Sequence, residues 1–276
     1  MDRDRPIGVF DSGVGGLSIL RALRAELPGE DFVYFSDAGH APYGEKGEHF
    51  VSRRSLEIAV DLLEQHRIKA LVVACNTATA AAVHLLRSHH GHLPVVGVEP
   101  ALKPGAALTK TGRVGVLATR GTLSSAKFQT LLTSLRHQAD FVLVPCDGLA
   151  AAIEAGDEAR VRELCRRYTV EVCCFGTGPG EIDTLVLGCT HYPFAEATFR
   201  ELLGPAVQLV ETGQPVARQT RRLLEARNLL NPHGRGGVQW RTTGAPESLQ
   251  AAAARWLGLV ERPAAGSGDD DLKLAA

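Results

Sequence analysis

The chain of 276 residues lacks three features that would assign it to the membrane, to secretion or to nucleic-acid binding. No run reaches the roughly 18 consecutive apolar residues of a membrane-spanning helix, and the N-terminus alternates charges where a signal peptide has an apolar stretch. The formal charge is −1, from 30 basic and 31 acidic residues, so no basic excess is available to bind a phosphate backbone. We therefore expect a cytoplasmic protein that binds neither membranes nor nucleic acids.

Paired CxxC spacing, typical of zinc ligands and redox-active disulfides, is also absent, although the chain has six cysteines. We expect reduced thiols, because nothing in the sequence indicates an oxidising compartment. His89, His90 and His92 form a local cluster, but no cysteine or carboxylate stands at ligand spacing from them. We therefore expect no metal site.

The sequence does contain short apolar runs that end in polar or glycine clusters and then enter a periodic segment. This pattern is typical of parallel strands alternating with helices, and it predicts an α/β fold. Four of the runs recur in the same order after a nearly constant interval, as residues 7–11 and 114–118, 31–33 and 140–142, 71–75 and 185–189, and 98–99 and 210–211. Four matches in register favour an internal duplication over coincidence.

The duplication predicts two pseudo-symmetric parallel-sheet lobes. Ligands of open parallel sheets bind outside the carboxyl ends of the strands, so facing lobes would place both sets of strand ends around one cleft, the expected active site. We expect residues 1–98 with 212–260 to form the first lobe and residues 99–211 the second. The segment 261–276, with proline, glycine, serine and three consecutive aspartates, is predicted to be a disordered tail.

Two cysteines stand at equivalent places of the repeat. Cys75 and Cys189 each close an apolar run and precede residues that commonly start helices. A helix N-terminus lowers the pKa of a thiol, and the thiolate is the form that accepts protons or attacks carbon. A lone cysteine is usually a small buried hydrophobe, but two at matching positions point to a shared cleft. We expect the others to lie in the core: Cys146, Cys165, Cys173 and Cys174.

A glycine-rich loop follows the first predicted strand, at residues 11–16. Its glycines would allow a tight turn, and Ser12 with exposed amides could meet an anion, while Asp11 could equally be a turn or capping residue. The dinucleotide fingerprint GxGxxG fails because Ser18 stands where its third glycine belongs, although Asp37 lies where a ribose-binding acid is expected. A nucleotide-binding module therefore remains an alternative.

Three further positions have a functional and an ordinary interpretation. His191, two residues after Cys189, could hold or shuttle a proton near that thiol. The loop 42–44 is typical of a turn, with Tyr43 free to donate a hydrogen bond into the cleft. Glu154 is by default a solvated helix residue.

Taken together, the motifs resemble those of glutamate racemases, cofactor-independent enzymes of the aspartate/glutamate racemase family. The resemblance rests on residues 10–17 (FDSGVGGL), 37–38 with 42–44, 74–78 (ACNTA), 188–193 (GCTHYP) and 242–244 (TTG), and covers nearly the whole chain except the tail. It implies racemisation of glutamate by two bases without a cofactor, with D-glutamate supplied to peptidoglycan synthesis. It also implies an α/β fold and, as is common among relatives, a homodimer.

Roles at the site follow from the same resemblance. Cys75 and Cys189 would carry the protons, Asp11 would assist Cys75, and His191 with Glu154 would assist Cys189. The positions that bind substrate in the family correspond here to Asp11, Ser12, Pro42, Tyr43, Gly44, Asn76, Thr77, Thr119, Thr122, Thr190 and His191. Only six residues precede Ile7, so we expect no activation through the longer N-terminal extension of some relatives.

Several other functions would each account for some of these residues. An aspartate racemase, or a racemase of another amino acid, would use the same cysteines, because pocket depth and not the thiols selects the side chain. A decarboxylase of the same superfamily needs a single cysteine. A thiol hydrolase built on Cys189 and His191 would leave Cys75 without a role, as would the nucleotide-binding module.

Overall fold

The computed structural model describes residues 2–259, and the predicted tail 261–276 lies outside them. The first part of the chain forms β1 (Ile7–Asp11), α1 (Leu17–Glu26), β2 (Phe32–Ser36), the 3-10 turns η1 (Ala38–His40) and η2 (Tyr43–Glu45), α2 (Glu48–His66), β3 (Ala70–Val73), α3 (Asn76–His89) and β4 (Val95–Gly97). The second forms α4 (Leu102–Leu108), β5 (Arg113–Ala118), α5 (Arg120–Ser124), α6 (Ala126–Leu135), β6 (Asp140–Pro145), α7 (Leu149–Ala155), α8 (Glu158–Val172), β7 (Thr184–Leu187), η3 (Tyr192–Ala195), α9 (Glu196–Leu203) and β8 (Gln208–Val210). The chain then adds α10 (Gly213–Ala226), β9 (Val238–Thr242) and α11 (Pro246–Leu257). Within residues 2–259, no helix has both the length and the apolar character that a membrane crossing requires.

The two sheets are parallel and share one topology. The first has the strand order β4-β3-β1-β2-β9, and the second, read from its far edge, has β8-β7-β5-β6. Each strand of the second sheet thus takes the place of the strand that the sequence repeat pairs with it. This confirms the predicted α/β fold with two related parallel sheets. One match is displaced by a residue: Val210 is the last residue of β8, whereas Val98 lies just beyond β4.

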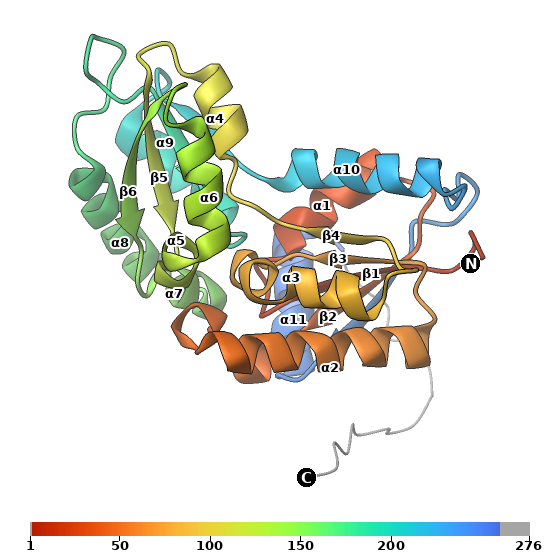
Figure 1. The fold of residues 1–276 in the computed structure, drawn as a ribbon. Coiled ribbons are helices and arrows are strands. Elements are labelled where there is room, and N and C mark those ends of the chain that lie inside the picture. Colours follow the sequence, from red (N-terminus) through yellow and green to blue (C-terminus); the bar gives the residue numbers. More distant parts are fainter. Residues whose placement is uncertain (1, 260–276) are drawn as a thin grey trace.

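Each sheet has helices on both faces (Figure 1). Helices α2 and α3 bury apolar side chains against one face of the first sheet, and α1, α10 and α11 cover the other. In the second sheet α4 and α6 cover one face, and α7, α8 and α9 the other. Strands β1, β2, β3 and β7 are buried along their whole length, as expected of parallel strands covered on both sides. These two-sided cores hold the strand ends in fixed positions.

The segment after β8 packs on the first sheet. Helices α10 and α11 contact α1, and β9 pairs in parallel with β2, with Phe32 opposite Val238 and Ser36 opposite Thr242. On this packing we propose that residues 1–98 and 212–260 form one lobe and residues 99–211 the other.

Two of the four cysteines predicted to lie in the core are exposed. Cys146 and Cys165 are buried as expected, but Cys173 and Cys174 are accessible to solvent. Helix α8 ends at Val172, directly before them. Positive φ angles of 65° at Cys173 and 51° at Cys174 turn the chain away from the helix and toward the surface.

Candidate active site

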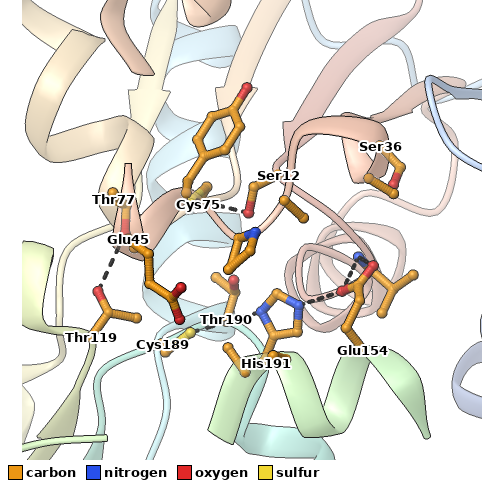
Figure 2. A pocket seen from close by; sticks show the side chains of 18 of the residues that line it. Ser12, Ser36, Glu45, Cys75, Thr77, Thr119, Glu154, Cys189, Thr190 and His191 are labelled. Atoms are coloured by element: carbon orange, nitrogen blue, oxygen red, sulfur yellow. Dashed lines mark hydrogen bonds and ion pairs between the residues drawn. The ribbon is translucent and has the colours of Figure 1, made fainter. Parts of the chain in front are cut away.

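A cavity of about 420 Å³ lies between the lobes, where strands of both sheets end. Figure 2 shows Cys75, from the first lobe, and Cys189, from the second, as side chains of this one pocket. The structure brings twelve of the predicted site residues to its wall: Ser12, Pro42, Tyr43, Gly44, Cys75, Asn76, Thr77, Thr119, Glu154, Cys189, Thr190 and His191. It does not bring Asp11 or Thr122 there.

Cys75 follows β3 and is the N-cap residue of α3. Its Sγ accepts a hydrogen bond from the backbone N–H of Ala78 at 3.4 Å and donates one to the Ser12 hydroxyl at 3.6 Å. The prediction of a lowered thiol pKa is wrong for this residue. Burial and the nearby Asp11 carboxyl outweigh the hydrogen bonds at the helix start and raise the pKa of Cys75 to about 12. Cys75 is therefore a protonated thiol near neutral pH.

Cys189 has different surroundings, because no α-helix begins at this residue. The chain instead continues through Thr190 to the 3-10 turn η3, so the predicted helix start is wrong here. The partner of its thiol is an imidazole: Nδ1 of His191 lies 3.8 Å from the Sγ atom. The two cysteines are thus equivalent in the repeat but not in their polar contacts.

The other nitrogen of His191 binds the Glu154 carboxylate, with Nε2 2.6 Å from Oε2. Burial alone would lower the pKa of His191, but the hydrogen bonds and charges of Cys189 and Glu154 outweigh it and hold this pKa well above its usual value. Burial in turn opposes ionisation of Glu154, yet its bond to His191 keeps the Glu154 pKa below its usual value. The two side chains therefore form an ion pair, and the His191 cation lies beside the Cys189 sulfur.

The ordinary interpretation of Glu154 as a solvated helix residue is accordingly wrong. Its side chain, on α7, is 23% exposed, and its carboxylate also accepts hydrogen bonds from the backbone N–H of Val14, at 2.9 and 3.1 Å. The glycine-rich loop thus binds an anion, as predicted, but here the anion is a carboxylate of the second lobe. A Cβ on Gly13 would lie 2.5 Å from Oε1 of Glu154, and one on Gly15 would overlap Nδ1 of His191. Glycine is required at both positions because the ion pair approaches the backbone closely.

Asp11 is completely buried and lies behind the wall of the cavity. Its Oδ2 accepts a hydrogen bond from the backbone N–H of Gly13 at 2.9 Å, while Oδ1 has no partner among the described residues. Burial raises the pKa of Asp11. The structure thus places Asp11 where its charge acts on Cys75, and it gives no support to the predicted contact with substrate. Thr122, also behind the wall, receives a hydrogen bond from Thr119 at 2.9 Å.

Asp37 and Tyr43 form a buried network at the edge of the cavity. The Tyr43 hydroxyl donates to Oδ2 of Asp37 at 2.6 Å, so it is not free to donate into the cleft as predicted. Asp37 also binds the Arg54 guanidinium, at 2.7 and 3.2 Å, and the Thr243 hydroxyl, at 2.9 Å. These bonds hold the Asp37 pKa below its usual value despite burial. Because its oxygens are engaged, Asp37 does not fit the ribose-binding role of the nucleotide alternative.

Hydrogen bonds cross between the lobes on two sides of the cavity. Ser18 of α1 donates to the carbonyl of Thr190 at 2.8 Å, and the hydroxyls of Thr77 and Thr119 lie 3.3 Å apart. Helix α5 also contacts α3 and η2. These contacts hold the two lobes together beside the cavity.

Among the wall residues that sequence reasoning missed, Cys146 and Glu45 bear on the chemistry of the cavity. Cys146, assigned to the core, lines the cavity because it follows β6 as Asp37 follows β2, and the repeat could have revealed this. Burial raises the pKa of this thiol. Glu45 also lines the cavity, and no local pattern predicts it beyond its place after the loop 42–44.

Glu45 differs from the other acidic residues of the wall. Glu154 is paired with His191, and Asp147 is paired with Arg120 at 2.5 Å. The Glu45 carboxylate forms no hydrogen bond or ion pair with any residue within 2–259, and Figure 2 shows it among the side chains of the pocket. An anionic group is therefore available for a cationic part of a ligand.

Comparison with known proteins identifies the family. The sequence profile of the Asp/Glu/Hydantoin racemase family matches residues 14–220. The chain belongs to this family. A glutamate racemase from Ectopseudomonas mendocina is 46% identical over 255 residues, which cover 92% of this chain and 95% of the relative. The protein is therefore a racemase, which is an isomerase.

Solved structures of other racemases have the same fold. Glutamate racemase isoform RacE1 from Bacillus anthracis superimposes with a TM-score of 0.80 and is 33% identical, covering 93% of this racemase and 95% of that chain. Escherichia coli glutamate racemase, solved in complex with L-glutamate and the activator UDP-MurNAc-Ala, gives a TM-score of 0.78 at 32% identity, with coverages of 91% and 95%. The agreement extends over both lobes.

Proposed function

We propose that this racemase interconverts L- and D-glutamate, with Cys75 and Cys189 exchanging protons at the α-carbon. The observation that carries the proposal is that two thiols, from equivalent strand ends of two lobes, line one cavity. Inversion at a carbon requires one group to remove a proton from one face and a second to return a proton to the other. Relatives similar over nearly their full length are glutamate racemases, which supports glutamate as the substrate.

The different surroundings of the thiols assign their starting roles. Cys189, which lies beside the His191 cation, removes the α-proton, and Cys75 starts as the thiol that returns one. After the turnover Cys189 is a thiol and Cys75 a thiolate, so the number of protons is unchanged. The resulting state is the one that the opposite enantiomer requires. Asp11, behind Cys75, opposes the thiolate by its charge and so favours return of the starting state.

The carbanion beside the substrate carboxylate needs stabilisation, and the wall of the cavity offers donors for it. Hydroxyl, amide and backbone groups of the wall residues would bind the carboxylates and the ammonium: Ser12, Pro42, Tyr43, Gly44, Asn76, Thr77, Thr119, Thr190 and His191. Such fixed donors act most strongly where water is excluded. The Oδ1 of Asn76 is buried without a partner among residues 2–259, and as an acceptor it would take a hydrogen bond from the substrate ammonium.

The product gives the proposed reaction its place in the cell. D-glutamate made by this enzyme would supply peptidoglycan synthesis, and we place the reaction in the cytoplasm, where its substrate is made. We propose a homodimer because dimers are common among the glutamate racemases that this chain resembles. Light scattering of the purified protein tests that assignment. We propose no cofactor, because the two thiols suffice to carry both protons.

The test is to incubate the purified enzyme with D-glutamate in heavy water, without pyridoxal phosphate, and to follow optical rotation and deuterium at the α-carbon. We expect the wild type to lose optical rotation and to incorporate deuterium. Neither the Cys75→Ser nor the Cys189→Ser variant should racemise glutamate, whereas Cys165→Ser, which lies outside the cavity, serves as the control. Full activity in either cavity variant would refute the two-base assignment. Faster turnover of aspartate than of glutamate would favour the alternative substrate.

A further inference from the structure

The exposed pair Cys173 and Cys174 has no part in this reaction. It follows the last residue of α8 and precedes the loop that leads to β7, whose first residue is Thr184. The pair therefore lies at the amino end of the second sheet, whereas the cavity lies at the carboxyl end. Chemistry at these two thiols is separated from the active site by the length of the sheet.

The fold holds the two sulfurs together. The Sγ atoms of Cys173 and Cys174 are 2.7 Å apart, and both residues have positive φ angles. Hydrogen bonds fix the backbone on either side: the N–H of Cys173 donates to the carbonyl of Thr169 at 3.1 Å, and the N–H of Ile182 donates to the carbonyl of Cys174 at 2.8 Å. The dithiol is thus presented to solvent from an anchored turn.

A direct disulfide is a poor end state for this pair. Adjacent Cα atoms are about 3.8 Å apart, below the roughly 4.4–6.8 Å that disulfides span, so such a bond would be strained and easily reduced. The hydrogen bond between the two thiols also raises the pKa of Cys174, which favours the dithiol form. When a third atom bonds both sulfurs at a narrow angle, the sulfurs need not bond each other. The Cα separation that a disulfide requires then no longer applies.

The number of protein ligands available restricts which atom can bind to both sulfurs. A structural zinc ion takes four protein ligands, and within residues 2–259 no group of three or more His, Cys, Asp or Glu side chains is placed to hold a metal ion. A trivalent arsenic centre needs only two protein thiols, and its pyramidal geometry brings the two sulfurs close together. The pair matches this requirement in number, proximity and exposure.

We propose that Cys173 and Cys174 form a bidentate binding site for trivalent arsenicals of the type R–As=O. Two As–S bonds form, both S–H bonds break, and the two protons leave with the oxygen as one molecule of water. Arsenic stays trivalent and both sulfurs keep their oxidation state, so the reaction needs no oxidant or reductant.

The test uses phenylarsine oxide as the probe on the full-length protein, followed by intact-mass measurement after an excess of 2-mercaptoethanol. A monothiol displaces singly bonded arsenic but not a two-thiol chelate, whereas 2,3-dimercaptopropanol removes both. We expect the Cys173→Ser and Cys174→Ser variants each to retain one equivalent fewer than the wild type against the monothiol. Cys165→Ser, a change in the buried part of α8, should retain the wild-type number.

Peptide mapping of the wild-type adduct gives a second measurement that does not depend on any variant. The chelated arsenic should lie on the peptide that contains residues 173 and 174, and the racemase rate should be unchanged when that site alone is loaded. An equal number of retained equivalents in the wild type and in both variants, or an adduct only on the cavity cysteines, would overturn the proposal.

Discussion

The imidazole of His191 links the Glu154 carboxylate to the Cys189 thiol, with Nε2 2.6 Å from Oε2 of Glu154 and Nδ1 3.8 Å from the Cys189 sulfur. Cys75 has no such cationic partner among its contacts and instead donates to the Ser12 hydroxyl. A duplicated fold therefore carries an asymmetric pair of thiols. We propose that this asymmetry assigns the first proton abstraction to Cys189, and the following predictions test this assignment.

Glu154→Gln removes the anion that keeps His191 protonated. We expect kcat/KM to fall at least about 10-fold. The fall should not exceed the roughly 10²–10⁴-fold that general acid–base catalysis contributes. The loss must be the same in both directions, because the equilibrium constant between enantiomers is one. Circular dichroism assays started from L- and from D-glutamate measure both values. An unchanged kcat/KM would show that the ion pair does not support the thiolate.

The same variant should shift the alkaline limit of activity. In the wild type the raised His191 pKa keeps the imidazole cationic to higher pH, and in Glu154→Gln that pKa falls. We expect the alkaline limb of the kcat/KM profile to move to lower pH in the variant. NMR titration of the His191 ring identifies the group responsible, and coincident limbs in the two proteins would contradict this assignment.

The ion pair should also stabilise the fold over a defined range of pH. The Glu154 pKa is depressed below its usual 4.5, so its contribution is complete above about pH 4.5 and is lost as pH falls through the folded-state pKa. The His191 pKa is raised above 6.5, so its contribution is complete below about pH 6.5 and is lost as pH rises through the folded-state value. Urea denaturation should therefore show the largest difference in unfolding free energy between wild type and Glu154→Gln from about pH 4.5 to 6.5. A constant difference across pH would contradict this linkage.

Gly15→Ala tests the close approach of the glycine-rich loop to His191. The added methyl group would overlap Nδ1 of the imidazole, so the ring or the loop must shift and the contact between His191 and Cys189 changes. We expect the free energy of unfolding to fall by about 1–3 kcal/mol, as in other overpacked sites. We also expect kcat to fall by a larger factor than in the control variant described next. Gly47→Ala is the matched control, since its new Cβ meets nothing within 4 Å. Equal activities of the two variants would show that the position of the ring does not matter.

Glu45→Gln tests the unpaired carboxylate of the cavity wall. If Glu45 binds the substrate ammonium, its exposed position limits the effect to about 1 kcal/mol, or roughly a fivefold rise in KM, with kcat nearly unchanged. Initial rates over a range of glutamate concentrations provide both constants. A lower KM in the variant would show instead that Glu45 repels the substrate carboxylates.

The sequence predicts the architecture well because the signals are local. Buried parallel strands correspond to short apolar runs in the sequence. Because these runs recur in the same order, they predict two sheets of the same topology without any knowledge of contacts. The same repeat places Cys75 and Cys189 at equivalent strand ends. Most of the predicted wall residues follow from this, since they lie in the loops directly after those strands.

The errors concern features that depend on contacts distant in sequence. The raised pKa of Cys75 comes from burial and from Asp11, and the Tyr43 hydroxyl is engaged by Asp37, which is held in turn by Arg54. Glu154 has the pattern of a solvated helix residue, because its partner Val14 lies 140 residues away. Turns set by backbone angles, as at Cys173, are likewise invisible in composition or periodicity.

The most direct measurement of two-face proton exchange is the position of deuterium after the first turnovers of a single glutamate enantiomer in deuterium oxide. Two thiols on opposite faces predict one deuterium at the α-carbon of the product enantiomer, while the remaining substrate keeps its protium. Deuterium appearing equally in both enantiomers from the start, or protium carried over into the product, would mean that one group serves both faces.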